Sequence, residues 1–539
     1  MLGEIGFVLG MVAVVVAVGR VSGLVKLPSA VLLTAAGLVY ALLPGPNLEL
    51  DPEVVLDLVL PPLLYNAALG SSLLAIRSRL RTVVSLSVLL VLATALAVGG
   101  LLAWLVPVVP LAAGIVLGAA VAPPDPVAAL SVARRVGVPD RLATLIEGEG
   151  LLNDATALTT YQVASAVLLG AGFSLTSAVG TFAVSAVGGV LVGAGTAGLV
   201  RLSRRVLTDP LLVNAVSLAT PFAAYAAGEA LHVSGVLAVV IAGLIVGHHN
   251  PRLQSGSSRL QTSAVWQLVN FLLEGFVFLL IGQQLPHVVE GLDQYSTSTV
   301  LTTVGITLAA VLGLRPLWLV VTQHVPRRLH TRLGGEEDAA APAEVPLGAR
   351  DVLALSWAGT RGVVTLVAAF AMPATIGGTP VPARDLLVFA AYVVVLVTLL
   401  GQGLTFAPLL RALGLRAHPS NQARLRNQAR VAATDAALAR LDQLAEEDGV
   451  PQHLLSGIRN GLSGRRQRYQ ARLDSLTEDP DGGRPADQAT VIAARRAAIE
   501  AQHQELLRWR DAGRLPDRSL RVLQRELDHE ERTLATERH

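Results

Sequence analysis

The sequence predicts an all-α protein that crosses a membrane many times and ends in a polar helical tail. Three observations lead to this fold class. The 539 residues are 52% hydrophobic and 15% charged, with a mean hydropathy of +0.56, whereas soluble globular chains carry about 25% charged residues. Long apolar stretches recur over the first 417 residues, and the composition becomes polar near Pro419.

The regions 1–417 and 418–539 differ in charge. The first holds 22 Lys and Arg residues, whereas the second holds 20 in 122 residues. Acidic and basic residues nearly cancel in the second region, which argues against a nucleic-acid-binding arm. The chain has no cysteine, which excludes disulfides, thiolate metal sites and cysteine nucleophiles. We therefore expect a membrane domain over 1–417 and a cytoplasmic helical tail over 418–539.

A membrane-spanning helix needs roughly 20 predominantly apolar residues. Charged residues, Pro and Gly divide the first 417 residues into thirteen such stretches. They cover residues 3–19, 28–43, 53–75, 83–106, 110–133, 143–168, 173–200, 210–229, 232–248, 264–286, 297–323, 350–373 and 385–412.

The loops between these stretches test the count, because cytoplasmic loops carry an excess of Lys and Arg. Nineteen of the 22 basic residues follow odd-numbered stretches, and one, Arg384, follows an even-numbered stretch. The remaining two, Arg315 and Arg361, lie inside stretches. The alternation predicts thirteen spans, with the N-terminus outside the cell and the tail in the cytoplasm.

The fifth stretch contains Asp125 between Pro124 and Pro126. Proline removes a backbone donor and clashes with the preceding turn, so these prolines should break the helix at membrane depth. A broken helix frees carbonyl oxygens and exposes half-helix ends, which is how many transporters build ion sites. A proline kink with an incidentally buried aspartate is the simpler alternative.

The sixth stretch carries three further polar residues. Asp154 lies about eleven residues into it, or roughly 16 Å along a helix, which places it near the midplane. Glu149 and Asn153 are four residues apart and share one face, and Asp154 is turned about 100° away. The helix can thus offer a carboxylate to a cavity and anchor itself through the neighbouring face.

The twelfth stretch contains Arg361, flanked by glycines that weaken the helix. An unpaired arginine at that depth is very costly, so we expect a structural ion pair with Glu149. The fifth and twelfth stretches run in opposite directions and both are interrupted, which favours two inverted repeats, spans 1–6 and 8–13, with the binding site between them.

Three other polar residues lie in apolar surroundings. Asn66 either lines the cavity or makes a local hydrogen bond. Glu274 and Arg315 either face a crevice or pair with one another between helices, and pairing is the simpler expectation.

Three runs carry a family resemblance: PPDPVAALSVARRVGVPDRL, EGEGLLNDATAL and SWAGTRGVVTL. They resemble the cation:proton antiporters of the NhaP and sodium/proton exchanger type, in the electroneutral branch. The resemblance implies a dimer-forming scaffold and a mobile core that moves one cation in exchange for protons by an elevator-like movement. It also implies a homodimer in the plasma membrane that serves pH and salt homeostasis.

The resemblance also implies residue roles. Asp154 would be the central cation- and proton-binding carboxylate, with Asp125 nearby as a second ligand. Asn153 marks the electroneutral branch, and Glu149 and Arg361 match the stabilising ion pair of the family.

The chain departs from the family pattern at three positions. Pro124 replaces a Thr but keeps its backbone carbonyl, Gly150 replaces a Ser, and Asn66 stands where many prokaryotic members have Glu. Two hydroxyls and one carboxylate are thereby missing from the expected site.

The expected mechanism is competition. Burial opposes the charged form of a carboxylate and a bound cation supports it, so a proton and a cation compete for Asp154. Hard cations prefer oxygen ligands, which Asp154, Asp125, a carbonyl of the broken span and water would supply. Sodium is the first expectation, with lithium and potassium as alternatives, and no cofactor or enzymatic activity is expected.

Two other functional classes are compatible with the composition. One is a passive cation channel, and the other is a membrane sensor or scaffold with the tail as its output. The tail shows apolar residues at helical spacing, broken by the acidic, Gly- and Pro-containing link TEDPDGGRPADQ. A regulatory or dimerising role and a simple solvated tail both fit this pattern.

Overall fold

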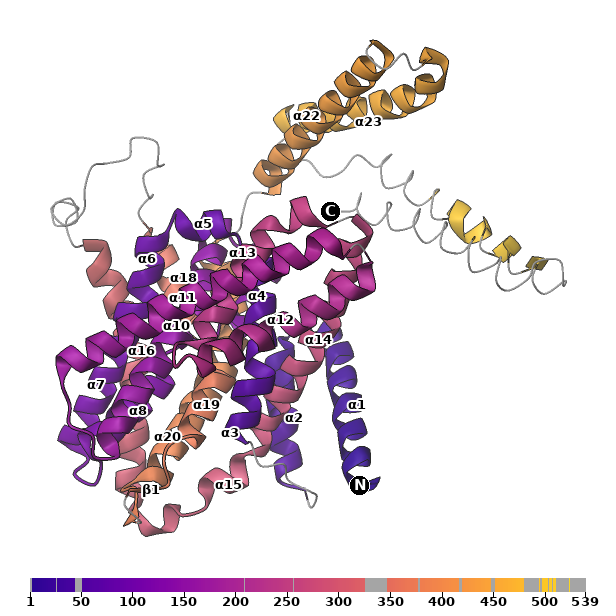
Figure 1. Cartoon of the computed structure of the whole chain (residues 1–539). Coiled ribbons are helices and arrows are strands. Elements are labelled where there is room, and N and C mark those ends of the chain that lie inside the picture. Colours follow the sequence, from indigo (N-terminus) through magenta and orange to yellow (C-terminus); the bar gives the residue numbers. More distant parts are fainter. Residues whose placement is uncertain are drawn as a thin grey trace. The chain divides into compact units, whose positions relative to one another are not determined.

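The computed structural model of the chain is helical in nearly all of its described residues (Figure 1). These are residues 2–25, 27–43, 51–207, 209–254, 256–324, 347–376, 379–415, 419–446 and 451–478, with short pieces between 494 and 523. Most of the predicted acidic link and most of the last amphipathic tail segment lie outside them. So do the basic loop residues Lys26, Arg327, Arg328, Arg332 and Arg416, and the side chain of Arg252.

The helices of the first half follow the predicted stretches closely. They are α1 (Leu2–Val25), α2 (Ser29–Ala41), α3 (Pro52–Val54), η1 (Val55–Val59), α4 (Leu60–Gly70), α5 (Leu73–Arg77), α6 (Leu80–Val84), η2 (Ser85–Leu89), α7 (Leu90–Leu105), α8 (Leu111–Val121), α9 (Pro126–Val136), α10 (Asp140–Leu168) and α11 (Leu175–Val206).

The second half continues in the same way, with one short antiparallel β-hairpin. Its elements are α12 (Pro210–Ala230), α13 (Gly235–Leu253), α14 (Gly256–Gln283), α15 (Leu285–Val289), η3 (Leu292–Gln294), α16 (Thr297–His324), α18 (Ala349–Trp357), α19 (Val363–Phe370), β1 (Thr375–Ile376), β2 (Thr379–Pro380), α20 (Arg384–Leu396), η4 (Val397–Gln402) and α21 (Gly403–Ala412).

Each of the thirteen predicted stretches coincides with a helix or with an interrupted helix. Among the described residues, eight helices are long and apolar enough to cross a membrane, and three shorter apolar helices accompany them. Large apolar side chains such as Leu191, Leu199 and Trp104 remain exposed along these helices, as expected of surfaces that face lipid.

The helices of residues 1–417 pack into two bundles. The first bundle comprises α1, α2, α4 and α11 to α14, and the second comprises α7 to α10, α16 and α18 to α21. Small residues permit close packing within each bundle. A Cβ added to Gly37 of α2 would lie 2.9 Å from the Cα of Gly282 in α14. An apolar cluster that includes Phe278, Leu366 and Tyr392 joins the two bundles.

The tail forms a separate compact unit from His418. Its α22 (Pro419–Glu446) and α23 (Gln452–Glu478) pair as a hairpin. Two ion pairs, Asp435 with Arg466 and Asp442 with Arg459, repeat at seven-residue intervals along both helices. This spacing is typical of the ion pairs that flank a coiled-coil seam. The two helices confirm the predicted helical character of this part of the tail.

Candidate functional site

Both predicted helix interruptions are present, and they meet one another. Residues 122–125 separate α8 from α9, and residues 358–362 separate α18 from α19. The backbone N–H of Asp125 donates to the carbonyl of Thr360 at 2.7 Å, and the Thr360 hydroxyl donates to the carbonyl of Asp125 at 2.9 Å. The backbone groups freed by the interruptions are therefore satisfied by the opposite segment, as irregular backbone at membrane depth requires.

Two charged side chains compensate the half-helix ends at this crossing. Asp125 accepts a hydrogen bond from the N–H of Val127 at 2.9 Å and also lies against Gly362, so it faces the positive N-terminal ends of α9 and α19. Arg361 donates to the carbonyls of Val121 and Gly359, so it faces the C-terminal ends of α8 and α18. The crossing thus carries an anionic side and a cationic side.

Asn153 holds α10 against the same crossing. Its Nδ2 donates to the carbonyl of Pro124 at 2.7 Å, and its Oδ1 is buried without a hydrogen-bond partner among the described residues. The Pro124 carbonyl, expected from the sequence as an ion ligand, is thus already engaged by an amide. The next residue, Asp154, is 6% exposed, and no described residue forms a hydrogen bond or ion pair with its carboxyl group.

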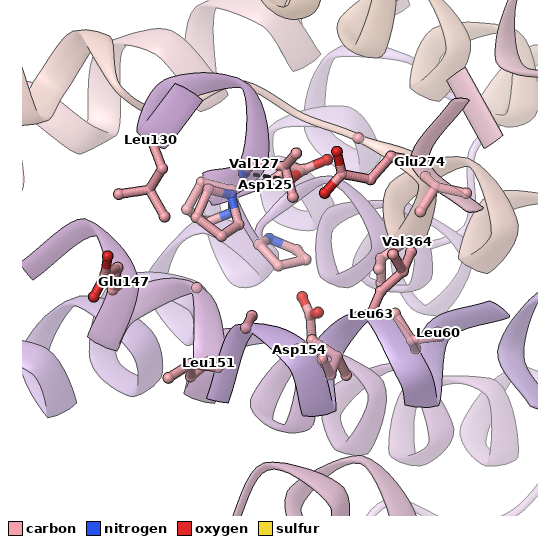
Figure 2. Close-up of a pocket in the computed structure, with 18 of the residues that line it drawn as sticks. Leu60, Leu63, Asp125, Val127, Leu130, Glu147, Leu151, Asp154, Glu274 and Val364 are labelled. Carbon is pink, nitrogen blue, oxygen red and sulfur yellow. Dashed lines mark hydrogen bonds between the residues drawn. The ribbon is translucent and has the colours of Figure 1, made fainter. Parts of the chain in front are cut away.

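A cavity of about 100 Å³ lies between the two bundles and brings Asp125 and Asp154 together. Figure 2 shows Asp154 pointing up from its helix toward Asp125, with Glu274 on the opposite wall. The first bundle contributes Leu60, Leu63, Leu64, Ala67, Ser71, Glu274, Val277 and Phe278, and the second contributes Pro123 to Val127, Leu130, Arg134, Glu147, Gly150, Leu151, Asp154 and Gly362 to Thr365.

The mouth of the cavity carries an ion pair. Arg134, 69% exposed at its side chain, donates to Glu147 at 2.9 Å. Both residues lie on the side that the basic-residue pattern predicts to be cytoplasmic. Among the described residues, no group of three or more His, Asp or Glu side chains is arranged to hold one metal ion.

The expected ion pair between Glu149 and Arg361 is wrong. Both Nη atoms of Arg315 instead donate to the Glu149 carboxylate, and the distance from Nη2 to Oε2 is 2.8 Å. The side chains of Glu149 and Arg315 are 1% and 4% exposed. The expected pairing of Arg315 with Glu274 is therefore also wrong, and Glu274 accepts a hydrogen bond from Asn270. Arg361 can do without a carboxylate partner because backbone carbonyls at two helix ends surround it.

The remaining predicted positions differ in their place relative to the cavity. Gly150 lines it, and a Cβ at this position would overlap with the ring of Pro126, which explains why a serine does not fit here. Asn66 is half-buried on α4 and is not among the residues that line this cavity. Thr365 does line it, and its buried hydroxyl oxygen has no hydrogen-bond partner among the described residues.

Sequence reasoning did not single out Thr365. It lies three residues after Gly362, on the first turn of a helix that begins at an interruption, which is the signal that could have identified it.

Comparison with known proteins identifies the family of this chain. Residues 10–412 match the family model described as sodium/hydrogen exchanger, transmembrane. The chain belongs to the sodium/hydrogen exchanger family. An uncharacterised Na⁺/H⁺ exchanger of Mycobacterium bovis is 34% identical over 98% of this chain and 97% of its own length. Members of the sodium/hydrogen exchanger family are antiporters that exchange cations for protons, and they are not enzymes.

Two further comparisons bear on activity and fold. A sodium, potassium, lithium and rubidium/H⁺ antiporter of Bacillus subtilis is 31% identical over 69% of this chain and 56% of its own length. The structure of the sodium proton antiporter MjNhaP1 from Methanocaldococcus jannaschii at pH 8 superposes with a TM-score of 0.59. It is 20% identical and covers 76% of this chain and 98% of that one, which shows that the two proteins share the NhaP fold.

Proposed function

We propose that this exchanger carries monovalent cations against protons by alternating access, with Asp154 as the carboxylate for which the two compete. Sodium is the first candidate, and lithium and potassium are the alternatives. The observation that carries the proposal is the Asp154 carboxyl group, which faces a cavity at the crossing of two interrupted helices and has no partner among the described residues.

The competition follows from the surroundings of Asp154. Apolar side chains line most of the cavity, so an ionised carboxylate needs a positive partner there. A proton and a hydrated cation both satisfy that need, and one excludes the other. Asp125 is the second acidic ligand, and the Asn153 Oδ1 offers a neutral oxygen at the same crossing. Glu149 and Arg315 serve as the structural pair.

The proposed transport movement takes place between the two bundles. The cavity lies at their interface, and its mouth at Arg134 and Glu147 faces the cytoplasm if thirteen spans cross with the N-terminus outside. In this arrangement the chain is inward-facing. We propose an elevator-like displacement of the second bundle, which holds both aspartates, past the first bundle.

Inverted repeats would explain a symmetry in the hydrogen bonding of the two interruptions. Asn153, on the helix after the first interruption, donates to Pro124 within that interruption. Thr398, on the helix after the second interruption, accepts from the N–H of Arg361 within it at 2.9 Å. Each of the repeats, spans 1–6 and 8–13, would then brace its own broken helix with its following helix.

At the level of the cell, the proposed setting is the plasma membrane. There the protein would act as a homodimer among lipids, with residues 418–539 as a cytoplasmic, regulatory tail, and would support pH and salt homeostasis. The near balance of acidic and basic residues in the tail gives no indication of a nucleic-acid partner.

Transport by the purified protein in proteoliposomes tests the proposal. We expect pulses of Na⁺, Li⁺ and K⁺ to drive saturable proton movement, reported by an internal pH dye, and Asp154→Asn to abolish it while the protein still inserts. Dissipation of a pH gradient without saturable cation dependence would indicate a passive channel. A complete lack of ion flux in the unmodified protein would indicate a sensor or scaffold, and exchange retained by Asp154→Asn would refute the role of that residue.

A further inference from the structure

Glu274 is a carboxylate that the first bundle contributes to the cavity wall. It lies on α14, is half-buried, and accepts a hydrogen bond from Asn270 one turn earlier. Figure 2 shows its carboxyl group on the cavity wall opposite Asp154, directed toward Asp125. Neither aspartate belongs to the same bundle as Glu274.

The charges around Glu274 do not neutralise it. Asp125 and Arg134 are the charged groups whose fields act on it most directly. Asp125 repels it, and Arg134 already pairs with Glu147 at the mouth. Besides the Arg134–Glu147 pair, three carboxyl groups therefore line a small cavity, and such a cavity attracts cations.

A buried oxygen atom in the cavity wall points independently to a polar ligand in the same cavity. Thr365 lines the cavity, is 1% exposed, and its Oγ1 has no hydrogen-bond partner among the described residues. Buried polar atoms are almost always satisfied, and a hard cation or its bound water would satisfy this oxygen.

We propose that Glu274 is the cation-attracting carboxylate that the stationary first bundle contributes to the cytoplasmic-facing cavity. The three carboxyl groups are not arranged to hold one bare ion together. A cavity of about 100 Å³ has room for roughly three water molecules. Glu274 thus attracts a hydrated cation, and water molecules separate Glu274 from Asp154 and Asp125.

The position of Glu274 on the first bundle has a consequence for sidedness. This step rests on the proposed function, in which the second bundle moves and carries Asp125 and Asp154 with it. Glu274 would remain behind, so it would strengthen cation binding from the cytoplasm and contribute little from outside. Glu274 would therefore determine the difference in cation affinity between the two faces.

Vesicles of opposite orientation test this inference. Inside-out and right-side-out membrane vesicles, prepared from cells without other exchangers, present the two faces of the full-length protein to added Na⁺. For Glu274→Gln we expect the KM for Na⁺ to rise about tenfold in inside-out vesicles, which corresponds to the loss of about 1.4 kcal/mol of attraction. In right-side-out vesicles the KM should change less than about twofold, because Glu274 would remain behind on the first bundle and its attraction for the cation falls with distance.

Two control variants and the unmodified protein separate the outcomes. Glu274→Asp keeps the charge and should retain most of the cytoplasmic affinity. Glu229→Gln, an exposed carboxylate of the same bundle outside the cavity lining, should leave both KM values unchanged. An unchanged KM for Glu274→Gln, or an equal rise on both faces, overturns the inference while the proposed function stands. Absence of exchange in the unmodified protein refutes the proposed function itself.

Discussion

At the scale of single residues, most buried charges in this exchanger have a partner that removes the cost of burial. Glu149 has Arg315, Arg361 has backbone carbonyls at two helix ends, and Asp125 caps α9. Asp154 has no such partner among the described residues. Because its surroundings leave the Asp154 carboxylate unsatisfied, we propose that this group exchanges a proton for a cation.

The corrected pairing of Glu149 gives a prediction about stability. Glu149→Ala leaves Arg315 buried and unpaired, so we expect a loss of about 3–5 kcal/mol in the free energy of unfolding. Thermal unfolding of detergent-purified single and double variants measures the coupling energy. We expect a larger coupling of Glu149 to Arg315 than to Arg361, and the reverse order would contradict the structure.

At the scale of elements, the crossing of two interrupted helices depends on Gly362. A Cβ at this position would overlap with the Asp125 carboxyl group, so the two interruptions can meet only at a glycine. We expect Gly362→Ala to reduce cation-driven proton movement at least tenfold by forcing the segments apart, measured with the same pH dye. Gly195→Ala on α11 is the matched control, because no atom lies within 4 Å of its added Cβ.

The helices and both interruptions could be predicted from the sequence, because apolar runs, prolines and glycines act locally. The convergence of Asp125 with Asp154 follows from the family resemblance rather than from any local pattern. The partners of Glu149 and the place of Glu274 could not be predicted. Arg315 is 166 residues away from Glu149, and which of two buried arginines reaches it depends on how helices rotate against one another. Hydropathy does not encode that rotation.

At the scale of the whole molecule, the exchanger is divided into the unit Met1–Ala417 and the unit His418–His539. The family match, residues 10–412, falls entirely within the first unit, and so does every residue that lines the cavity. We therefore expect the first unit to contain the transport machinery. The tail hairpin of α22 and α23 has its own ion pairs.

Removal of residues 418–539 tests this division. We expect the shortened protein to insert and to exchange cations for protons with a KM within about twofold of the full chain, since no cavity-lining residue is lost. Transport assays in proteoliposomes at several pH values measure this. Loss of exchange from a correctly inserted shortened protein would make the tail part of the transport machinery.

In the proposed mechanism, a cation and a proton compete for Asp154. The most direct test is the KM for Na⁺ of the full-length protein, measured in inside-out vesicles over a range of cytoplasmic pH. Because protonation removes the carboxylate that the cation needs, we predict that KM rises as pH falls, by up to about tenfold per pH unit, at constant maximal rate. A KM that does not change with pH, with only the maximal rate affected, would contradict competition at one carboxylate.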